Sequence, residues 1–330
     1  MKIIKLTGKR YKLNVIKRRL VIFRLKDKEK LVFPNPDALY IISGYGHMDL
    51  RAILKLSSYG LGVVIKTELS KNRLRIINPA ELELVSRQVQ HFIDREKRCF
   101  LVKQFTIAAL TNRLQTLTFL GRTLKRQTKI LDFGIRNLER VIKRLEQQKG
   151  NNVTADLFRN YIDEGDRIYI STVANLIPTR YRFTGRRREL ANDPVNVTIL
   201  YSYIGLIKNV RRILKDLGFH TEIGYLHSEP GNFDNLALDI SEEFYQPVID
   251  RIVFRLFIDE IISEEKHFTR EGGHLFLNED GKTLMSRILQ TEIRRFESFI
   301  TQQAIKLKKH LMENVPYKPY IWTIPEGANQ

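Results

Sequence analysis

Hydrophobic and polar positions follow two patterns along the chain, and the change between them falls near residue 79. The first part carries short stretches rich in Val, Ile and Tyr, such as LNVIKRRLVIFRL and ALYIISG, which are separated by Gly and Pro. This composition is typical of strands joined by turns. One short helix is expected there, over residues 49–58, ended by Gly60. The pattern predicts a small β-rich N-terminal domain.

From residue 80 onward, apolar residues recur every three or four positions, which is the pattern of amphipathic helices. One of these helices is delimited clearly, because Asp193 can serve as its N-cap, Pro194 suits its first position and Gly218 ends it. The predicted fold class is therefore α+β. The expected domains are residues 1–79, the small β-rich N-terminal domain; 80–94, a linker or first helix; and 95–330, a larger all-α C-terminal domain.

The charge of the chain points to a polyanionic partner. Lys and Arg number 56 against 37 Asp and Glu, a net charge of +19. The excess is uneven, since residues 1–150 hold 33 basic and 12 acidic side chains and the rest hold 23 and 25. A basic balance of this size is a statement about partners, and DNA or RNA is favoured over a membrane surface.

Two further features narrow the class of protein. The longest uncharged apolar stretch, Pro194 to Ile207, has 14 residues and is too short to span a bilayer, so no membrane partner is expected. The single cysteine, Cys99, excludes an internal disulfide and a Cys-based zinc site. We expect a cytoplasmic protein.

One carboxylate stands where an apolar residue is expected. Leu157, Tyr161, Glu164 and Ile168 share one helical stripe. A carboxylate is rarely buried unless a cation pairs with it or a ligand binds it. Glu164 is therefore either a ligand-binding residue or one half of a structural ion pair.

A second set of polar residues lies in the segment FHTEIGYLHSEPGNFDNLALDISEEFYQP. His227 ends a short apolar run, while Asp239 and Glu242 share the face of one helical turn. One imidazole and two or three carboxylates form a mixed donor set that suits Mg²⁺ or Mn²⁺. Beside a basic surface, such an ion suits phosphodiester chemistry. The alternatives are a structural histidine and acidic residues that only favour a helix N-terminus.

In the order and content of several motifs, the chain resembles the CRISPR-associated endonuclease/integrase "Cas-one", which is the spacer-acquisition (adaptation) enzyme family. The matching stretches are IDEGDRIY (162–169), RRRELANDPVN (186–196), GYLHSEPG (224–231), LALDISEEFYQPVIDR (236–251) and, more loosely, FTREGGHLFLNEDGKTLM (268–285). In the first 80 residues the chain resembles this family only in its expected pattern of short strands, then a helix, then strands.

The resemblance implies roles for particular residues. Glu164, His227 and Glu242 fall on the family's catalytic metal ligands, Asp239 on a supporting or alternative ligand, and Asn196 on a residue that orders the site. Tyr245 stands where many relatives carry Arg. The candidates for DNA contact are Arg186, Arg187, Arg188, Arg211 and Lys215, although three arginines in a row are as often simply exposed to solvent.

The family also implies an activity and partners. The expected reaction is metal-dependent transesterification, in which the 3′-hydroxyl of a captured DNA fragment attacks a phosphodiester of the repeat array. Mg²⁺ or Mn²⁺ is the expected cofactor, and duplex and branched DNA are the expected substrates. A homodimer formed through the N-terminal domain is expected to join a small ferredoxin-like second adaptation protein. Two other functions are left open: a general metal-dependent nuclease for branched DNA, and a non-catalytic DNA-binding scaffold.

Overall fold

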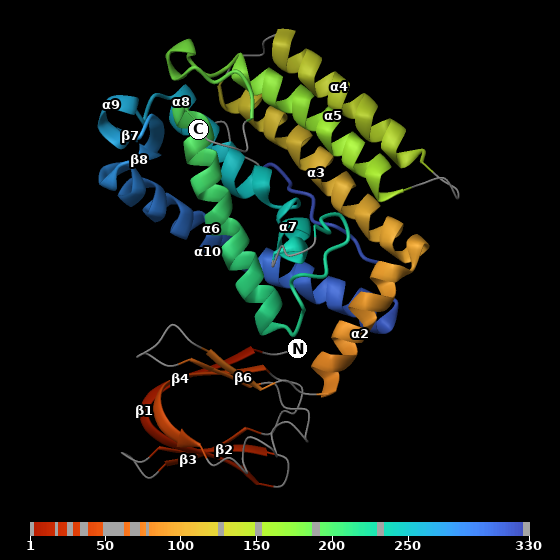
Figure 1. Ribbon diagram of the computed structural model, residues 1–330, viewed down its shortest axis with the longest axis vertical. Helices are drawn as coiled ribbons and strands as arrows, with labels where there is room; N and C mark the ends of the chain where they lie inside the picture. The colour runs from red at the N-terminus through yellow and green to blue at the C-terminus, as the bar shows by residue number, and fades with distance from the viewer. Residues whose placement is uncertain are drawn as a thin grey trace. The chain divides into compact units, whose positions relative to one another are not determined.

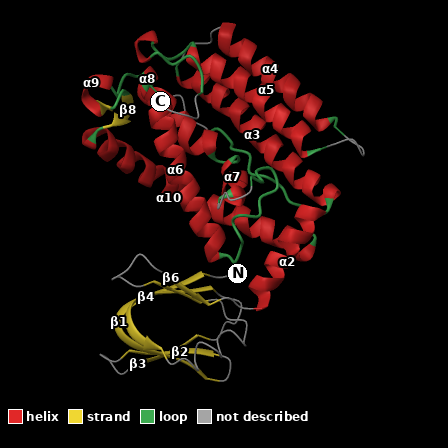
Figure 2. Cartoon of the chain, in the orientation of Figure 1, coloured by secondary structure: helices red, strands yellow, loops and turns green. Residues whose placement is uncertain are grey.

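The computed structural model divides the chain into two compact units. One consists of residues 1–89 and 215–220, and the other of residues 90–214 and 221–330. The residues that the structure describes are 3–16, 19–24, 29–33, 39–48, 63–66, 73–76, 79–124, 129–148, 154–186, 192–229 and 234–325. The helix expected over residues 49–58 lies outside them. Helices dominate the larger unit, as Figures 1 and 2 show.

The smaller unit contains a six-stranded mixed sheet in the order β3-β2-β1-β4-β5-β6. β1 pairs antiparallel with β2 and parallel with β4, and its register against β4 shifts once, between Lys9 and Tyr11. Gln88 accepts from the backbone nitrogen of His220 and donates to its carbonyl oxygen, which ties residues 215–220 to the helix that follows the sheet. The strands are β1 (Ile3–Ile16), β2 (Arg19–Arg24), β3 (Glu29–Phe33), β4 (Leu39–Met48), β5 (Val63–Lys66) and β6 (Arg73–Ile76).

Three long helices of the larger unit pack along one another, and Figure 1 shows α4 and α5 beside α3. On α4 the buried residues include Leu138, Val141 and Leu145, which are spaced by three and four positions as on one face of an amphipathic helix. The carboxylate of Asp94 caps the first turn of α3 by accepting from two backbone nitrogens. The helices from the end of the sheet to this point are α2 (Pro79–Ile93), α3 (Arg95–Thr123), α4 (Lys129–Glu146) and α5 (Ala155–Ala174).

The helix predicted from Asp193, Pro194 and Gly218 is present as α6 (Pro194–Asp216). Asp193 accepts a hydrogen bond from the backbone nitrogen of Asn196 at 2.9 Å, as an N-cap does. Gly218 follows the end with a φ of 99°, a conformation that favours glycine. A single turn of 3₁₀ helix, η1 (Thr179–Tyr181), precedes α6.

Residues 239–250, which follow α6 in the larger unit, are all buried. Pro247 lies inside a π-helical turn, and the following α-helix begins at Arg251. A π-turn leaves one backbone carbonyl without its usual helical donor, so it accommodates a proline. This turn contacts both α3 and the C-terminal helix. The elements are α7 (Asn235–Ser241), η2 (Tyr245–Asp250), α8 (Arg251–Ile258), α9 (Glu264–His267) and α10 (Glu279–Glu313).

The C-terminal domain is not all-α, which corrects the sequence prediction. A two-stranded antiparallel sheet, β7 (Phe268–Glu271) and β8 (His274–Leu277), lies between α9 and α10. Gly272 and Gly273 both have positive φ, which is the conformation of a tight two-residue hairpin turn. Two adjacent glycines were the local signal for this hairpin. Among the described residues, no helix has the length and hydrophobicity to cross a membrane.

Candidate active site

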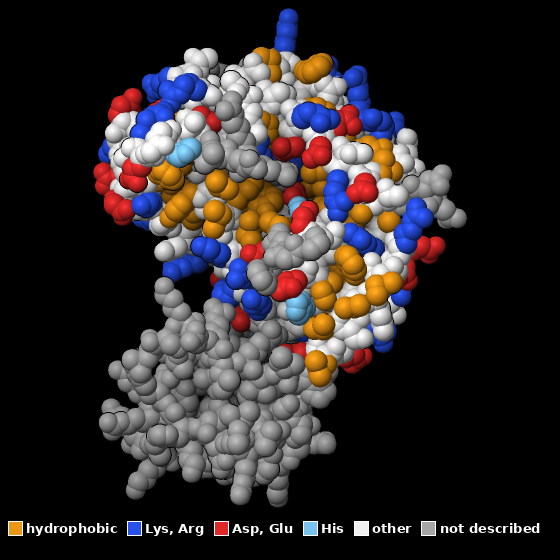
Figure 3. Space-filling model, viewed as in Figure 1, with side chains coloured by type: hydrophobic (Ala, Val, Ile, Leu, Met, Phe, Trp, Pro, Cys, Tyr) orange, Lys and Arg blue, Asp and Glu red, His pale blue; other side chains and the backbone are white. Residues whose placement is uncertain are grey.

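A cavity of about 400 Å³ lies in the larger unit between α3, α5, α6 and the segment around α7. Its wall combines charged and polar side chains with an apolar strip from α6 that includes Ile199 and Ile204. On the face drawn in Figure 3, hydrophobic side chains likewise gather beside acidic and histidine side chains. The polar residues of the wall include Arg113, Asp166, Arg186, Asn196, His227 and Glu242.

His227 comes from an irregular loop whose backbone is held by Asp239. The Asp239 carboxylate accepts from the backbone nitrogens of Tyr225, Leu226 and His227, at 2.5, 3.2 and 2.8 Å. It also contacts His227 Nδ1 at 2.9 Å. Because a carboxylate accepts, the proton sits on Nδ1 and Nε2 is the nitrogen available to a ligand. Asp239 therefore holds both the backbone of this loop and the imidazole of His227, and its role as a supporting residue or alternative ligand stays a prediction.

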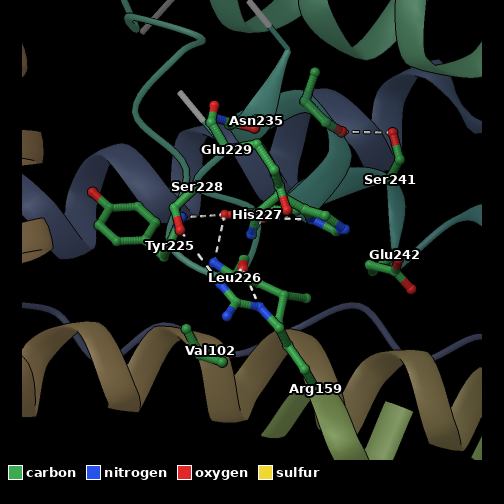
Figure 4. Close-up of polar contacts among 12 residues, drawn as sticks. Val102, Arg159, Tyr225, Leu226, His227, Ser228, Glu229, Asn235, Ser241 and Glu242 are labelled. Carbon is green, nitrogen blue, oxygen red and sulfur yellow. Dashed lines mark hydrogen bonds and ion pairs between the residues drawn. The ribbon is translucent and has the colours of Figure 1, made fainter. Parts of the chain in front are cut away.

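Two other features shape this loop. A Cβ atom on Gly224 would lie 2.3 Å from the carbonyl oxygen of His227, so only glycine allows the chain to turn back so closely. Burial disfavours charge on His227, but the hydrogen bond and negative charge of Asp239 outweigh it, and the pKa of His227 is raised. Figure 4 shows His227 and Glu242 as they extend from separate segments of the chain.

Glu242 follows the last residue of α7 and faces a buried arginine. Its Oε2 atom is buried and has no hydrogen-bond partner among the described residues, although Arg113 Nη2 lies 3.8 Å away. Arg113 Nη2 also pairs with Asp166 at 3.3 Å. Burial alone would lower the pKa of Arg113, but these two carboxylates outweigh it and raise the pKa. Glu242, which lines the cavity, thus carries a carboxylate oxygen that can still accept a hydrogen bond or bind a cation.

Arg186 occupies the same wall and is held by two carboxylates. Its guanidinium pairs with Asp166 at 3.1 Å and with the fully buried Asp250 at 3.2 Å. It also lies over the ring of Tyr203, which is stacked on Tyr245 at 4.1 Å between ring centroids. With 16% of its side chain exposed, Arg186 belongs to the wall of the cavity rather than to the outer surface.

Asn196 connects α6 to the chain that precedes it. Its side-chain nitrogen donates to the carbonyl oxygen of Gly185 at 2.8 Å and to Asp193 Oδ2 at 2.7 Å. Asn196 is 1% exposed and lines the cavity. The residue therefore fixes the start of α6 beside the site.

Glu164 is not buried as its stripe predicted. Its carboxylate pairs with Arg144 of α4, and 36% of its side chain is exposed. The buried position on this part of α5 belongs to Gly165 instead. Its neighbours Asp163 and Asp166 line the cavity. The structure therefore brings His227, Glu242, Asp239 and Asn196 together and shows Glu164 in an ion pair, while its role as a ligand stays a prediction.

Of the other DNA-contact candidates, Arg211 and Lys215 are not among the residues that line the cavity. Arg211 pairs with Asp234 at 3.0 Å, and Lys215 is exposed near the end of α6. Arg187 and Arg188 lie outside the described residues. Their roles as DNA contacts stay predictions.

Glu243, a buried carboxylate next to Glu242, was given no role by the sequence pattern. Its carboxylate accepts from Tyr317, from the backbone nitrogen of Tyr320 and from Gln303, at 2.5, 2.7 and 2.8 Å. Burial raises the pKa of Glu243 to about 7 against these donors. The C-terminal segment is thereby tied to the residue next to Glu242. Arg113 was also missed, because an arginine inside a long helix gives no local signal that it is buried.

The fit of a metal ion to these residues is partial. Across the parts of the chain that are described, no three His, Cys, Asp or Glu side chains gather closely enough to hold one. Two donors of the expected type do share the cavity, the imidazole of His227 and the orphaned oxygen of Glu242. A nitrogen and carboxylate oxygens suit Mn²⁺ or Mg²⁺. The third predicted donor, Glu164, would first have to leave Arg144.

Comparisons with solved structures show the fold. A casposase bound to integration product matches with a TM-score of 0.75 and 20% identity, over 97% of this chain and 98% of that one. A chain of a partial Cas6-RT-Cas1–Cas2 complex matches with a TM-score of 0.66 and 21% identity, over 99% of each chain.

Comparisons of sequence identify the family. A curated protein from Thermus thermophilus, "CRISPR-associated endonuclease Cas1 1", is 33% identical over 171 residues, which are 48% of this chain and 54% of that protein. The family model of CRISPR associated protein Cas1 matches residues 4–291. The chain therefore belongs to the CRISPR-associated Cas1 family.

Proposed function

We propose that this protein is a divalent-metal-dependent DNA integrase and endonuclease that inserts captured DNA fragments into a CRISPR repeat array. The observation that carries the proposal is one cavity whose wall contains both the oriented imidazole of His227 and the side chain of Glu242, which has an oxygen without a hydrogen-bond partner among the described residues. Membership in the Cas1 family supports it. So do its similarity to a protein named as a Cas1 endonuclease and its structural similarity to a casposase bound to integration product.

The residues of the cavity divide into ligands and supports. His227 Nε2 and Glu242 would hold a Mg²⁺ or Mn²⁺ ion, with Glu164 as a third ligand after it leaves Arg144. When bound, such an ion would neutralise the charge that develops on the scissile phosphate. Asp239 holds the proton of the imidazole on Nδ1. The positive charge of Arg113 pairs with the carboxylates of Asp166 and Glu242 and offsets the repulsion between them.

The charge of the chain suits DNA as a partner. The chain carries a net charge of +19, and Arg186 places a guanidinium in the cavity wall where it can meet a phosphate oxygen. The proposed substrates are duplex and branched DNA. The proposed partners are a second copy of the chain, through the N-terminal unit, and a small ferredoxin-like adaptation protein. The similarity to a chain of a Cas6-RT-Cas1–Cas2 complex supports a partner of that kind.

The test uses a branched DNA that mimics the half-integrated product, with Mn²⁺ or Mg²⁺ and without a partner protein. Wild type is expected to rejoin a continuous strand, and both EDTA and His227→Ala are expected to abolish the product. His220→Ala is the matched control, because the exposed His220 bonds to Gln88 through its backbone alone and should keep full activity. Binding of the duplex should change by no more than a few-fold in either variant.

Three results would contradict the proposal in different ways. Cleaved fragments without rejoining would indicate a nuclease for branched DNA. Binding without any metal-dependent reaction, even after the adaptation protein is added, would indicate a scaffold. Equal joining by wild type and His227→Ala would show that the cavity is not the reaction site.

A further inference from the structure

The loop that carries His227 is also held from its outer side, by two arginines from separate helices. Arg98 lies near the start of α3 and Arg159 in the first turns of α5. Both reach the same four-residue loop, Tyr225 to Ser228, as Figure 4 shows for Arg159. Neither arginine belongs to the wall of the cavity or to the motifs that the sequence pointed out.

The two guanidinium groups satisfy the carbonyl oxygens of this loop. Arg98 Nε donates to the carbonyl oxygen of Tyr225 at 3.0 Å. Arg159 donates to the carbonyl oxygen of Leu226 through Nε at 3.0 Å and through Nη2 at 2.7 Å. Their Nη2 atoms then converge on Ser228 Oγ, at 3.0 Å from Arg98 and 3.3 Å from Arg159. The last residue before His227 and the first residue after it are thus both fixed.

These contacts complement those made by Asp239. The carboxylate of Asp239 accepts hydrogen bonds from the backbone N–H groups of the loop. The two arginines donate hydrogen bonds to the carbonyl groups of the same loop. A loop has no ladder of its own hydrogen bonds, so its backbone needs such partners to hold one conformation. Removing the arginines would leave Asp239 as the main restraint on His227.

Placing two like charges on one loop has an electrostatic cost. Burial lowers the pKa of Arg98, and the charge of Arg159 lowers it further. Arg159 is offset in part by Asp156 at the start of α5, with which it pairs. A single arginine or a neutral side chain would avoid this repulsion. The two arginines are therefore better explained by the single conformation that they impose on the loop than by a gain in the free energy of unfolding.

We propose that Arg98 and Arg159 are positioning residues that hold the His227 imidazole in the one orientation that presents Nε2 to the cavity. The inference rests on the proposed function, in which His227 is a metal ligand. Bonds that orient a ligating histidine affect metal affinity although they do not touch the metal. Because both arginines bond to neighbouring backbone groups, loss of one lets the His227 ring sample other orientations part of the time. Loss of both removes the preference for the single orientation.

The test compares Arg98→Gln, Arg159→Gln, the double variant and Arg159→Lys in the full-length protein. Arg167→Gln is the matched control, since it removes an exposed arginine from the same helix as Arg159. The first measurement needs no metal. Imidazole ¹⁵N shifts at a pH where His227 is neutral report whether one tautomer, with the proton on Nδ1, prevails. The second is the affinity for Mn²⁺ by titration calorimetry, without DNA, so that contacts with phosphates play no part.

Wild type and Arg167→Gln should show the single Nδ1-protonated tautomer. In the double variant the two nitrogen shifts should move toward each other, and Mn²⁺ should bind about 10- to 100-fold more weakly, the range for removed supporting bonds. Each single Gln variant should lose several-fold, and Arg159→Lys should recover part of that loss, because an ammonium can still donate to the carbonyl of Leu226. Urea unfolding identifies the variants that remain folded, and the single variants decide the question where the double variant does not fold.

Wild-type shifts and wild-type Mn²⁺ affinity in folded Gln variants would overturn the positioning role. Failure of the proposed function gives a different result: wild type itself would bind no Mn²⁺. The imidazole shifts would still decide in that case whether the arginines orient the ring.

Discussion

Two parts of the candidate site are built in different ways. His227 lines the cavity and extends from a loop, and Asp239 accepts hydrogen bonds from three backbone N–H groups of that loop and contacts the ring nitrogen. Glu164 extends from α5 next to residues that line the cavity, is partly exposed and pairs with Arg144. A loop does not place a side chain by itself, so the loop-borne residue requires buried bonds. A helix already fixes the backbone, which leaves the helix-borne side chain free to exchange partners.

The largest expected effect is the loss of the Asp239 charge. Asp239→Asn replaces one acceptor oxygen by a donor that faces backbone N–H groups, and the unpaired buried groups should lower the free energy of unfolding by about 4 kcal/mol. Urea denaturation measures this. Asp163→Asn is the control, since Asp163 is exposed and its change should cost less than about 0.5 kcal/mol. A loss below about 1 kcal/mol in Asp239→Asn would show that the loop does not depend on this carboxylate.

The next effect concerns Glu243, the neighbour of Glu242 that belongs to the core. Its pKa in the folded protein is about 7, above the value of 4.5 for the free side chain. Between these values the unfolded chain releases the proton while the folded protein keeps it. The stability that Glu243 contributes is therefore complete below pH 4.5 and is lost as the pH rises toward 7. The loss amounts to about 3 kcal/mol at 1.36 kcal/mol per pKa unit.

The substitution Glu243→Gln should remove this dependence on pH. Urea unfolding of the metal-free protein at several pH values between 4.5 and 7.5 gives the slope for wild type and variant. Glu222→Gln, at an exposed position, serves as the control and should keep the wild-type slope. An equal slope in Glu243→Gln and wild type would mean that the Glu243 carboxyl is already ionised in the fold near pH 5.

A smaller effect is expected from Gly224→Ala, at the tight turn before the loop. The added Cβ would meet the carbonyl oxygen of His227 at 2.3 Å, so backbone atoms must shift, at a cost of about 2 kcal/mol. At Gly185 a Cβ would meet nothing within 4 Å, and Gly185→Ala should be close to neutral. Thermal melts of the two variants provide the comparison. Similar melting temperatures would show that the loop yields without cost.

The sequence predicted well what depends on local signals. The bounds of α6 followed from Asp193, Pro194 and Gly218, each of which acts on its own turn of the helix. His227 and Glu242 do line one cavity, while their roles as metal ligands stay predictions. The hairpin at Gly272 was overlooked because two short strands within a helical region give a weak alternation.

The features that the sequence did not predict depend on contacts between distant parts of the chain. Arg98 and Tyr225 are 127 positions apart, and Glu243 and Tyr317 are 74 apart. No periodicity marks such pairs, since each residue fits its own helix or loop without the other. Glu164 shows the opposite error: its stripe predicted burial, but Gly165 takes the buried place and the long side chain of Glu164 reaches Arg144 instead.

The smallest effect decides which account of Glu164 is correct. The pair with Arg144 is exposed on both sides, at 52% and 36%, so Arg144→Gln should change the free energy of unfolding by no more than about 0.5 kcal/mol. If Glu164 is a ligand, Arg144 competes for its carboxylate. The variant should then bind Mn²⁺ about two-fold more tightly, equivalent to about 0.4 kcal/mol. Arg140→Gln, one helical turn away, should leave the affinity unchanged. Titration calorimetry resolves a difference of this size, and an unchanged affinity in Arg144→Gln together with reduced stability would make Glu164 one half of a structural ion pair.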